Sequence, residues 1–129
     1  MLAIDTNLVV RYLTGDHPGQ SAKAKALIDG HDVFVPTTVL LESEWVLRSA
    51  YGFATAEVAR ALTGFAGLAR VHLEDPALTA TALGWAAQGL DFADALHLAR
   101  SEGCEAFITF DRRFKRRSES IPGAEVRIP

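Results

Sequence analysis

Apolar residues occur in two alternating patterns along the chain: short unbroken runs, and longer stretches with an apolar residue every three or four positions. A short unbroken run is typical of a strand covered on both faces of a parallel sheet, and the wider spacing is typical of an amphipathic helix. Strands are therefore expected at about 2–5, 33–35, 71–73, 106–110 and 125–128, the last at a sheet edge. Helices are expected from residue 6 to Gly15, Gln20 to Ile28, Thr37 or Thr38 to Gly52, Thr55 to Leu68, Asp75 to Gln88, and Asp91 to Gly103.

This alternation predicts the α/β class, with a mostly parallel sheet of four to five strands covered by helices on both faces. The 129 residues suit one domain over 1–129, and an apolar content of 49% is enough for a core. No stretch is long and apolar enough to span a membrane, and the N-terminus lacks a signal-peptide pattern. The single cysteine, Cys104, excludes an internal disulfide and a Cys-rich zinc site. The low cysteine content fits a reducing, cytoplasmic environment, and the net charge of −3 argues against broad polyanion binding, so we expect any nucleic-acid contact to be a local patch.

Two of the expected strands end in an aspartate. Asp5 follows the run 1–4, and Asp111 follows the run 106–110. The carboxyl ends of parallel strands lie at one edge of a sheet, where open α/β folds bind ligands, so we expect both aspartates at one cleft. Each could instead serve only as the N-cap of the segment that follows it. Their equivalent positions favour a shared site.

Glu42 and Glu44 lie in the helix after the second strand. The residues three and four positions from Glu42 are apolar or threonine and include no cation. Arg48 follows Glu44 by four residues and can pair with it at the surface. We therefore expect Glu44 to be solvated and Glu42 to lie among apolar residues, where a carboxylate needs a partner or a metal. The alternative is that Glu42 is an ordinary exposed glutamate.

Asp91 and Asp94 lie at the start of the last long helix. Asp91 is expected to be its N-cap, and Asp94 would stabilise the first turn through the helix dipole. That role needs only one of the two acids, and Asp94 shares a helix face with His97. We therefore expect Asp94 to point into the cleft and Asp91 to support it.

Together, Asp5, Glu42, Asp94 and Asp111 would form a pocket of four carboxylates. Without a cation they would repel one another and raise one another's pKa. Oxygen ligands, with no cysteine and few histidines, suit Mg²⁺ or Mn²⁺ rather than zinc. Such ions activate water and neutralise charge on a phosphodiester during in-line displacement.

The order of these motifs, from Asp5-Thr6-Asn7 through Glu42 and Phe92–His97 to Thr109-Phe110-Asp111, resembles the PIN-domain nucleases. Within that family, the whole chain looks like the VapC-type toxins of bacterial toxin–antitoxin pairs. The resemblance implies a three-layer α/β/α domain and a Mg²⁺-dependent endoribonuclease. It implies that the catalytic and metal-binding residues are Asp5, Glu42, Asp94 and Asp111. The supporting residues would be Thr6, Asn7, Asp91 and Thr109.

The resemblance also implies protein partners. The family includes homodimers, and its members are usually neutralised by a cognate antitoxin whose C-terminal segment wraps the toxin and blocks the site. The residues themselves also favour a homodimer. The helices that carry Val58, Leu62 and Phe65, or Leu83 and Trp85, have more apolar surface than one small sheet can cover.

Five cations follow Asp111 directly: Arg112, Arg113, Lys115, Arg116 and Arg117. We expect a basic turn that holds RNA phosphates beside the site without reading bases. The alternatives are a solvated turn and a docking site for acidic residues of the antitoxin.

Other functions share parts of this pattern. A Mg²⁺-dependent phosphoaspartate phosphatase or receiver needs a second acid beside or two residues after the first, and a lysine at a later strand end. Asn7 and Asp111 stand at those positions here. A non-catalytic domain of the same fold would be expected to lack one of the acids. A PIN-fold nuclease that acts on DNA or structured nucleic acid is not separated by sequence from a ribonuclease.

Overall fold

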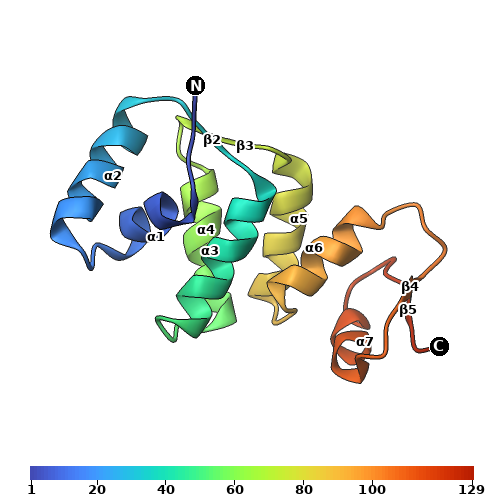
Figure 1. Ribbon diagram of the computed structural model, residues 1–129. Coiled ribbons are helices and arrows are strands. Elements are labelled where there is room, and N and C mark those ends of the chain that lie inside the picture. The colour runs from blue at the N-terminus through green and yellow to red at the C-terminus, as the bar shows by residue number, and fades with distance from the viewer.

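Strands and helices alternate along the chain in the computed structural model, which describes residues 1–129 (Figure 1). The strands are β1 (Leu2–Ala3), β2 (Val33–Val35), β3 (Val71–Leu73), β4 (Phe107–Ile108) and β5 (Val126–Arg127). The helices are α1 (Thr6–Thr14), α2 (Pro18–Gly30), α3 (Thr37–Ser49), α4 (Thr55–Ala66), α5 (Pro76–Ala87), α6 (Phe92–Arg100) and α7 (Arg112–Ser118). None of the helices combines the length and the apolar character needed to cross a membrane. The predicted α/β class is confirmed, and the run expected to be a basic turn forms α7.

All strand pairs are parallel, as predicted, but the five strands form two sheets instead of one. The first sheet has the order β1-β2-β3, and the second contains only β4 and β5. In the first sheet Val33 and Val35 of the central strand are fully buried, which explains its unbroken apolar run. The expectation that β1 and β4 belong to one sheet is therefore wrong for the single chain.

Contacts with α6 explain where the second sheet lies. The C-terminal segment (residues 107–127) is placed beyond α6 and apart from β1 in Figure 1. The Phe107 ring stacks on His97 of α6 with ring centroids 6.5 Å apart, and Phe114 is only 3% exposed. Arg117 Nη1 donates a hydrogen bond of 2.6 Å to the carbonyl of Gly89, in the turn before α6. These contacts hold the segment to the helices of its own chain.

The core is one continuous apolar cluster that joins the helices to the first sheet. Val58, Leu62 and Phe65 recur on one face of α4 and are all buried, and Leu83 of α5 is buried as well. These residues are therefore covered within the chain and supply no surplus apolar surface, whereas Trp85 is half-buried; the homodimer itself stays a prediction. The exposed large apolar residues lie elsewhere: Met1, Leu2, Trp45, Phe53, Leu68, Ile108 and Phe110.

Several helix ends follow from local chemistry. Asp75 accepts a hydrogen bond from the Leu78 amide and precedes Pro76 at the first helical position, as predicted. The start of α3 differs, because neither threonine caps it; the Thr37 amide instead donates to Glu74 Oε1 at 2.9 Å. Gly15 ends α1 in the left-handed region, at φ 66°, where a side chain would be strained.

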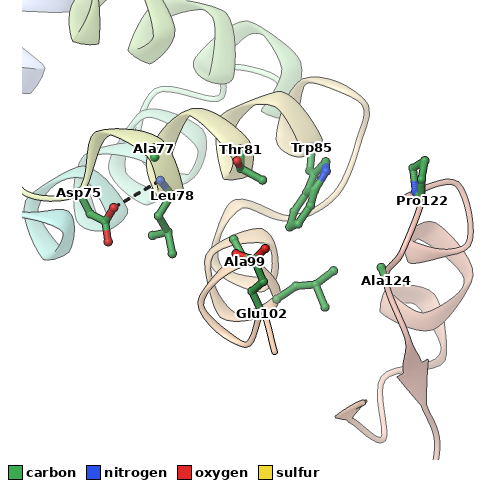
Figure 2. A pocket seen from close by; sticks show the side chains of 10 residues that line it. Asp75, Ala77, Leu78, Thr81, Trp85, Ala99, Glu102, Pro122 and Ala124 are labelled. Carbon is green, nitrogen blue, oxygen red and sulfur yellow. Dashed lines mark hydrogen bonds between the residues drawn. The ribbon is translucent and has the colours of Figure 1, made fainter. Parts of the chain in front are cut away.

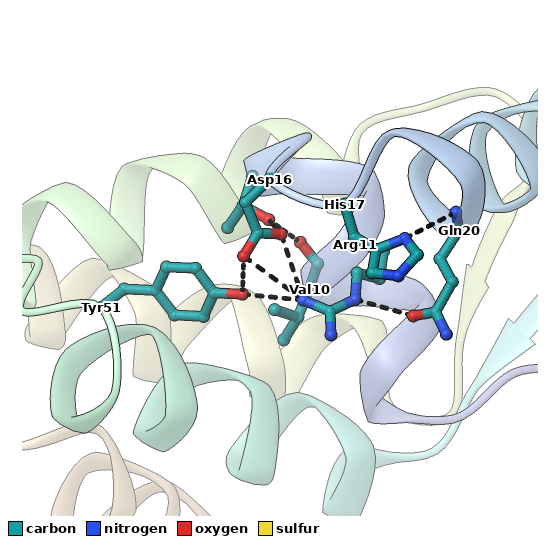
Figure 3. A network of polar contacts seen from close by, with 7 residues as sticks. Val10, Arg11, Asp16, His17, Gln20 and Tyr51 are labelled. Carbon is teal, nitrogen blue, oxygen red and sulfur yellow. Dashed lines mark hydrogen bonds and ion pairs between the residues drawn. The ribbon is translucent and has the colours of Figure 1, made fainter.

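A polar network ties the end of α1 to the residues after α3 (Figure 3). Tyr51 donates a hydrogen bond of 2.7 Å to Asp16 Oδ2, and Thr14 donates one of 2.8 Å to Asp16 Oδ1. Arg11 Nη1 lies 3.1 Å from Asp16 Oδ1 and donates to the Tyr51 oxygen at 3.0 Å. The bonds from Tyr51 and Thr14, and then the charge of Arg11, lower the pKa of Asp16 below its ordinary value. The network therefore favours the ionised form of Asp16.

Replacing Tyr51 by phenylalanine is expected to raise the pKa of Asp16, because the largest cause of its depression is removed. A carboxyl whose pKa is lower in the folded than in the unfolded protein stabilises the fold at any pH above the unfolded pKa. This stabilisation is lost as the pH falls through the folded pKa. The variant should therefore melt below the wild type at neutral pH, with the difference vanishing in acid. Carboxyl NMR titration and melting curves against pH measure both effects. Tyr12→Phe, which removes a hydroxyl bonded to Asp29, is the matched control and should leave Asp16 unchanged.

Candidate functional site

The predicted site residues fall into two separate groups in the single chain. The N-terminal acidic group consists of Asp5 and Glu42, and the C-terminal acidic group consists of Asp91, Asp94 and Asp111. No three acidic, histidine or cysteine side chains come close enough together to hold one metal ion. The predicted four-carboxylate pocket is therefore not assembled within one chain, because β4 pairs with β5 and not with β1.

The N-terminal acidic group lies where β1 passes into α1. Asp5 caps α1: its Oδ1 accepts a hydrogen bond of 2.8 Å from the Asn7 amide. The buried Thr6 hydroxyl donates to Glu42 Oε1 and so joins α3 to the start of α1. Asp5 and Asn7 also line an open pocket of about 350 Å³ that includes the cations Arg11 and Lys23. Asp5 thus acts as a cap while remaining exposed to solvent.

The two glutamates of α3 have the reverse of their expected environments. Glu44 is 1% exposed and lies on the same helix face as Leu40 and Leu47, whereas Glu42 is exposed. Arg48 Nε donates to Glu44 Oε2 at 2.5 Å, and Arg48 Nη2 donates to Oε1 at 3.1 Å. The predicted Glu44–Arg48 pair therefore forms, but it is largely buried instead of solvated. Its hydrogen bonds raise the pKa of Arg48.

The C-terminal acidic group lines a pocket of about 420 Å³ between α3, α6 and α7. Asp91 caps α6 by accepting the Asp94 amide at 3.2 Å, and Asp111 caps α7 by accepting two amides. The Thr109 hydroxyl accepts the Asp111 amide at 3.0 Å, so Thr109 contacts one of the predicted catalytic acids. The cap expected for Asp91 and the cap given as the alternative role of Asp111 are therefore both present, and both residues still line the pocket.

Asp94 is the one acid of this group that caps no helix. Burial raises its pKa most, and the charges of Asp91 and Asp111 raise it further, while His97 acts in the opposite direction. Two carboxylates near a partly desolvated third indicate excess negative charge at this position. Titratable groups perturbed in this way are enriched at functional sites.

Cations balance part of this charge. Arg113 and Arg117, four residues apart on α7, line the pocket together with Arg48 of α3. Arg48 Nη2 also lies 3.5 Å from Asp91 Oδ1, which connects the buried Glu44 to the pocket. Arg48 was missed as a site residue, because its spacing from Glu44 indicates the helix pair but not the contact with Asp91.

The remaining residues of the predicted RNA-binding run do not line this pocket. Arg112 and Arg116 are exposed, and Lys115 Nζ pairs with Glu119 at 3.5 Å. The run is therefore divided by the helix: Arg113 and Arg117 face the acids, and the other three cations face elsewhere.

A third cavity, of about 490 Å³, lies between α5, α6 and the C-terminal segment (Figure 2). Trp85 stands between α5 and the segment that carries Pro122 and Ala124, and Glu102 lies at the α6 side. None of the predicted site residues lines this cavity. The acidic pocket is therefore the better candidate for the functional site.

The family model described as the PIN domain matches residues 2–120. The chain belongs to the PIN domain family. The matched region of this PIN domain includes both acidic groups and all five cations of the basic run. No curated protein and no solved structure matches the chain. PIN domains are typically metal-dependent nucleases, and the chain falls in that general class.

PIN-domain nucleases generally use divalent metal ions, so the acids can be tested against that requirement. The chemistry agrees: the donors are carboxylates, which suit hard divalent cations. The geometry of one chain does not agree, because the acids are divided between two places. The PIN domain as a single chain thus has the ligands of a divalent site without bringing three of them together.

Proposed function

We propose that this PIN domain is a Mg²⁺-dependent endoribonuclease, with Mn²⁺ as an alternative ion, and that it is the toxin of a toxin–antitoxin pair. Its nuclease class rests on the family match over residues 2–120. The observation that carries the proposal further is the environment of Asp94, whose pKa is raised by burial and by two neighbouring acids in a pocket that arginines also line. Acids and cations in one pocket suit a metal-assisted reaction on a phosphodiester.

The residues have distinct roles in this proposal. Asp5, Glu42, Asp94 and Asp111 are the catalytic and metal-binding acids, and Thr6, Asn7, Asp91 and Thr109 position them. Thr6 does so through its bond to Glu42, and Thr109 does so by accepting the Asp111 amide. Arg113 and Arg117 hold the RNA backbone at the pocket. The cognate antitoxin would cover this pocket, and we place both proteins in the cytoplasm with their RNA substrate.

Cleavage of labelled oligonucleotides tests the proposed function. Purified protein with Mg²⁺ should cut single-stranded RNA internally, and a chelator should abolish the cutting. DNA of the same sequence should remain intact. Cleavage of DNA with RNA left intact would replace the ribonuclease by a DNA-directed PIN nuclease. Absence of any cleavage with Mg²⁺ or Mn²⁺ would contradict the catalytic proposal.

Arg113→Ala is expected to weaken RNA binding for all sequences and to reduce the slope of log affinity against log salt by about 1, because one phosphate contact is lost. Arg116→Ala, which removes the same charge outside the pocket, is the matched control and should have a smaller effect. Arg117 is less suitable for this comparison, because it also anchors the segment to Gly89. Fluorescence anisotropy in a salt series measures both variants.

If both arginine variants bind RNA like the wild type while Arg113→Ala no longer binds the antitoxin, the cations of α7 serve the protein partner and not the substrate. Equal losses in both variants would instead indicate general attraction to the helix and would remove the pocket-specific role of Arg113.

A further inference from the structure

Strand β1 has an open edge with an exposed surface. The amides of Leu2 and Ile4 donate to β2, at 3.0 Å to the Asp32 carbonyl and 3.1 Å to the Phe34 carbonyl. Because backbone groups alternate in direction along a strand, the amide and carbonyl of Ala3 face the opposite side, where no strand lies. Both residues of β1 are exposed, with Leu2 at 45%. An apolar edge strand left unpaired in this way is a template for another strand.

Strand β4 has a matching open edge. The amides of Phe107 and Thr109 donate to β5, at 2.8 and 3.0 Å, so the backbone groups of Ile108 and Phe110 face away from it. Ile108 is 54% exposed and Phe110 is 85% exposed. Exposed large apolar side chains on an unpaired strand are costly in water and are typical of a surface that another element covers.

The two edges are complementary in direction and register. Both strands belong to parallel sheets, and each ends just before an aspartate of the proposed site. A parallel pairing that sets Asp5 beside Asp111 also sets Leu2 beside Ile108. In that register the amide and carbonyl of Ala3 meet the carbonyl of Ile108 and the amide of Phe110, which are the groups each edge leaves free.

We propose that two copies of the chain pair reciprocally, with β4 of each copy added to β1 of the other. Each resulting sheet has the order β3-β2-β1, followed by β4 and β5 of the second copy. Each of the two sites then combines Asp5 and Glu42 of one copy with Asp94 and Asp111 of the other. This inference rests on the proposed function for its catalytic consequence, but the strand pairing itself is independent of activity.

The occupant of the β1 edge is a second copy because the chain's own β4 is held elsewhere. Three features hold the C-terminal segment beside α6. They are the stacking of Phe107 on His97, the burial of Phe114, and the hydrogen bond from Arg117 to the Gly89 carbonyl. Closure of β4 onto β1 of the same chain would break these contacts. Pairing with a second copy keeps them, and a two-fold arrangement satisfies both open edges at once.

Cross-linking distinguishes these arrangements. The variant Leu2→Cys/Ile108→Cys, made with Cys104→Ser to remove the exposed native thiol, places two half-exposed cysteines side by side across the proposed pairing. A short bis-maleimide should convert most of this protein to a covalent dimer. Links confined to the monomer, or no links, would overturn the proposal. The control Leu73→Cys/Ile108→Cys uses β3, at the opposite edge of the sheet, and should link poorly; equal linking would also count against specific pairing.

Mixing two inactive variants tests the shared site. Asp5→Asn and Asp111→Asn each keep an N-cap and should each be inactive alone. In a mixed strand-exchanged dimer one site carries both substitutions and the other carries neither, so an equal mixture should regain about a quarter of wild-type cleavage. If each site belonged to one chain, no activity would return, and the proposal would fail. Should the wild type cleave no RNA, the proposed function fails, while the cross-linking result still decides the pairing.

Discussion

Asp94→Asn is expected to reduce RNA cleavage by about a thousandfold or more while leaving the protein folded. The substitution preserves shape but removes the charge of the one acid in its pocket that caps no helix. The substitution also removes the cost of burying a charge and the repulsion from Asp91 and Asp111. These two effects, burial first, raise the pKa of Asp94 in the wild type. The metal-free variant should therefore melt slightly above the wild type, by about 2 °C. Initial cleavage rates and thermal melts at neutral pH measure the two effects.

Two comparisons make this prediction specific. Asp75→Asn keeps the cap of α5 outside the acidic pocket, so it should leave cleavage near the wild-type rate. Asp5→Asn should also abolish cleavage but should stabilise the protein less, because Asp5 is exposed and its substitution relieves no cost of burying a charge. Full activity of Asp94→Asn would remove Asp94 from the catalytic residues.

Glu44→Ala is expected to lower the free energy of unfolding by about 3 kcal/mol, because it leaves Arg48 partly buried without its main partner. Arg48 is 27% exposed, and water can reach it, so we place the loss at the lower end for a broken buried pair. Chemical denaturation measures the loss.

The matched control is Glu42→Ala, the same truncation on the exposed face of α3. It should cost about 1 kcal/mol or less, through the bond from Thr6. A double-mutant cycle with Arg48→Met tests the cause: the cost of Glu44→Ala should shrink once the cation is gone. A loss of similar size from both glutamate variants would show that the buried pair is not the source of the stability.

Local patterns predicted the elements well. The unbroken run 33–35 forms the fully buried central strand, because only a strand covered on both faces needs no polar residue. Two helix starts were predicted correctly: that of α5 from Asp75 before Pro76, and that of α6 from Asp91 three residues before Asp94. Capping depends on neighbours in sequence, so sequence patterns can reveal it. The family resemblance was confirmed at the level of the PIN domain.

The direction of a helix face was harder to predict. Counting apolar neighbours put Glu42 inside and Glu44 at the surface, but α3 turns Leu40, Glu44 and Leu47 to the core together. The burial of Val58, Leu62 and Phe65 was misassigned to a dimer surface for the same reason. The spacing of residues fixes which of them share a face, whereas the packing of distant elements decides which face is covered.

The candidate site shows the same limit on a larger scale. The patterns at Asp5 and Asp111 correctly indicated a parallel strand before each aspartate, although β1 already ends at Ala3 and β4 at Ile108. Whether two such strands are neighbours depends on contacts far along the chain, such as that of Arg117 with Gly89. The acids therefore could be named from sequence, but their division into two groups could not.

We propose that the N-terminal and C-terminal acidic groups together form one divalent-ion site. Titration calorimetry with Mn²⁺ alone tests it without relying on cleavage, using the wild type, Asp5→Asn and Asp94→Asn. We predict that the wild type binds the ion and that each substitution, one in each group, weakens binding at least about tenfold. Wild-type affinity and stoichiometry in Asp5→Asn, with binding lost only in Asp94→Asn, would contradict a shared site for the two groups.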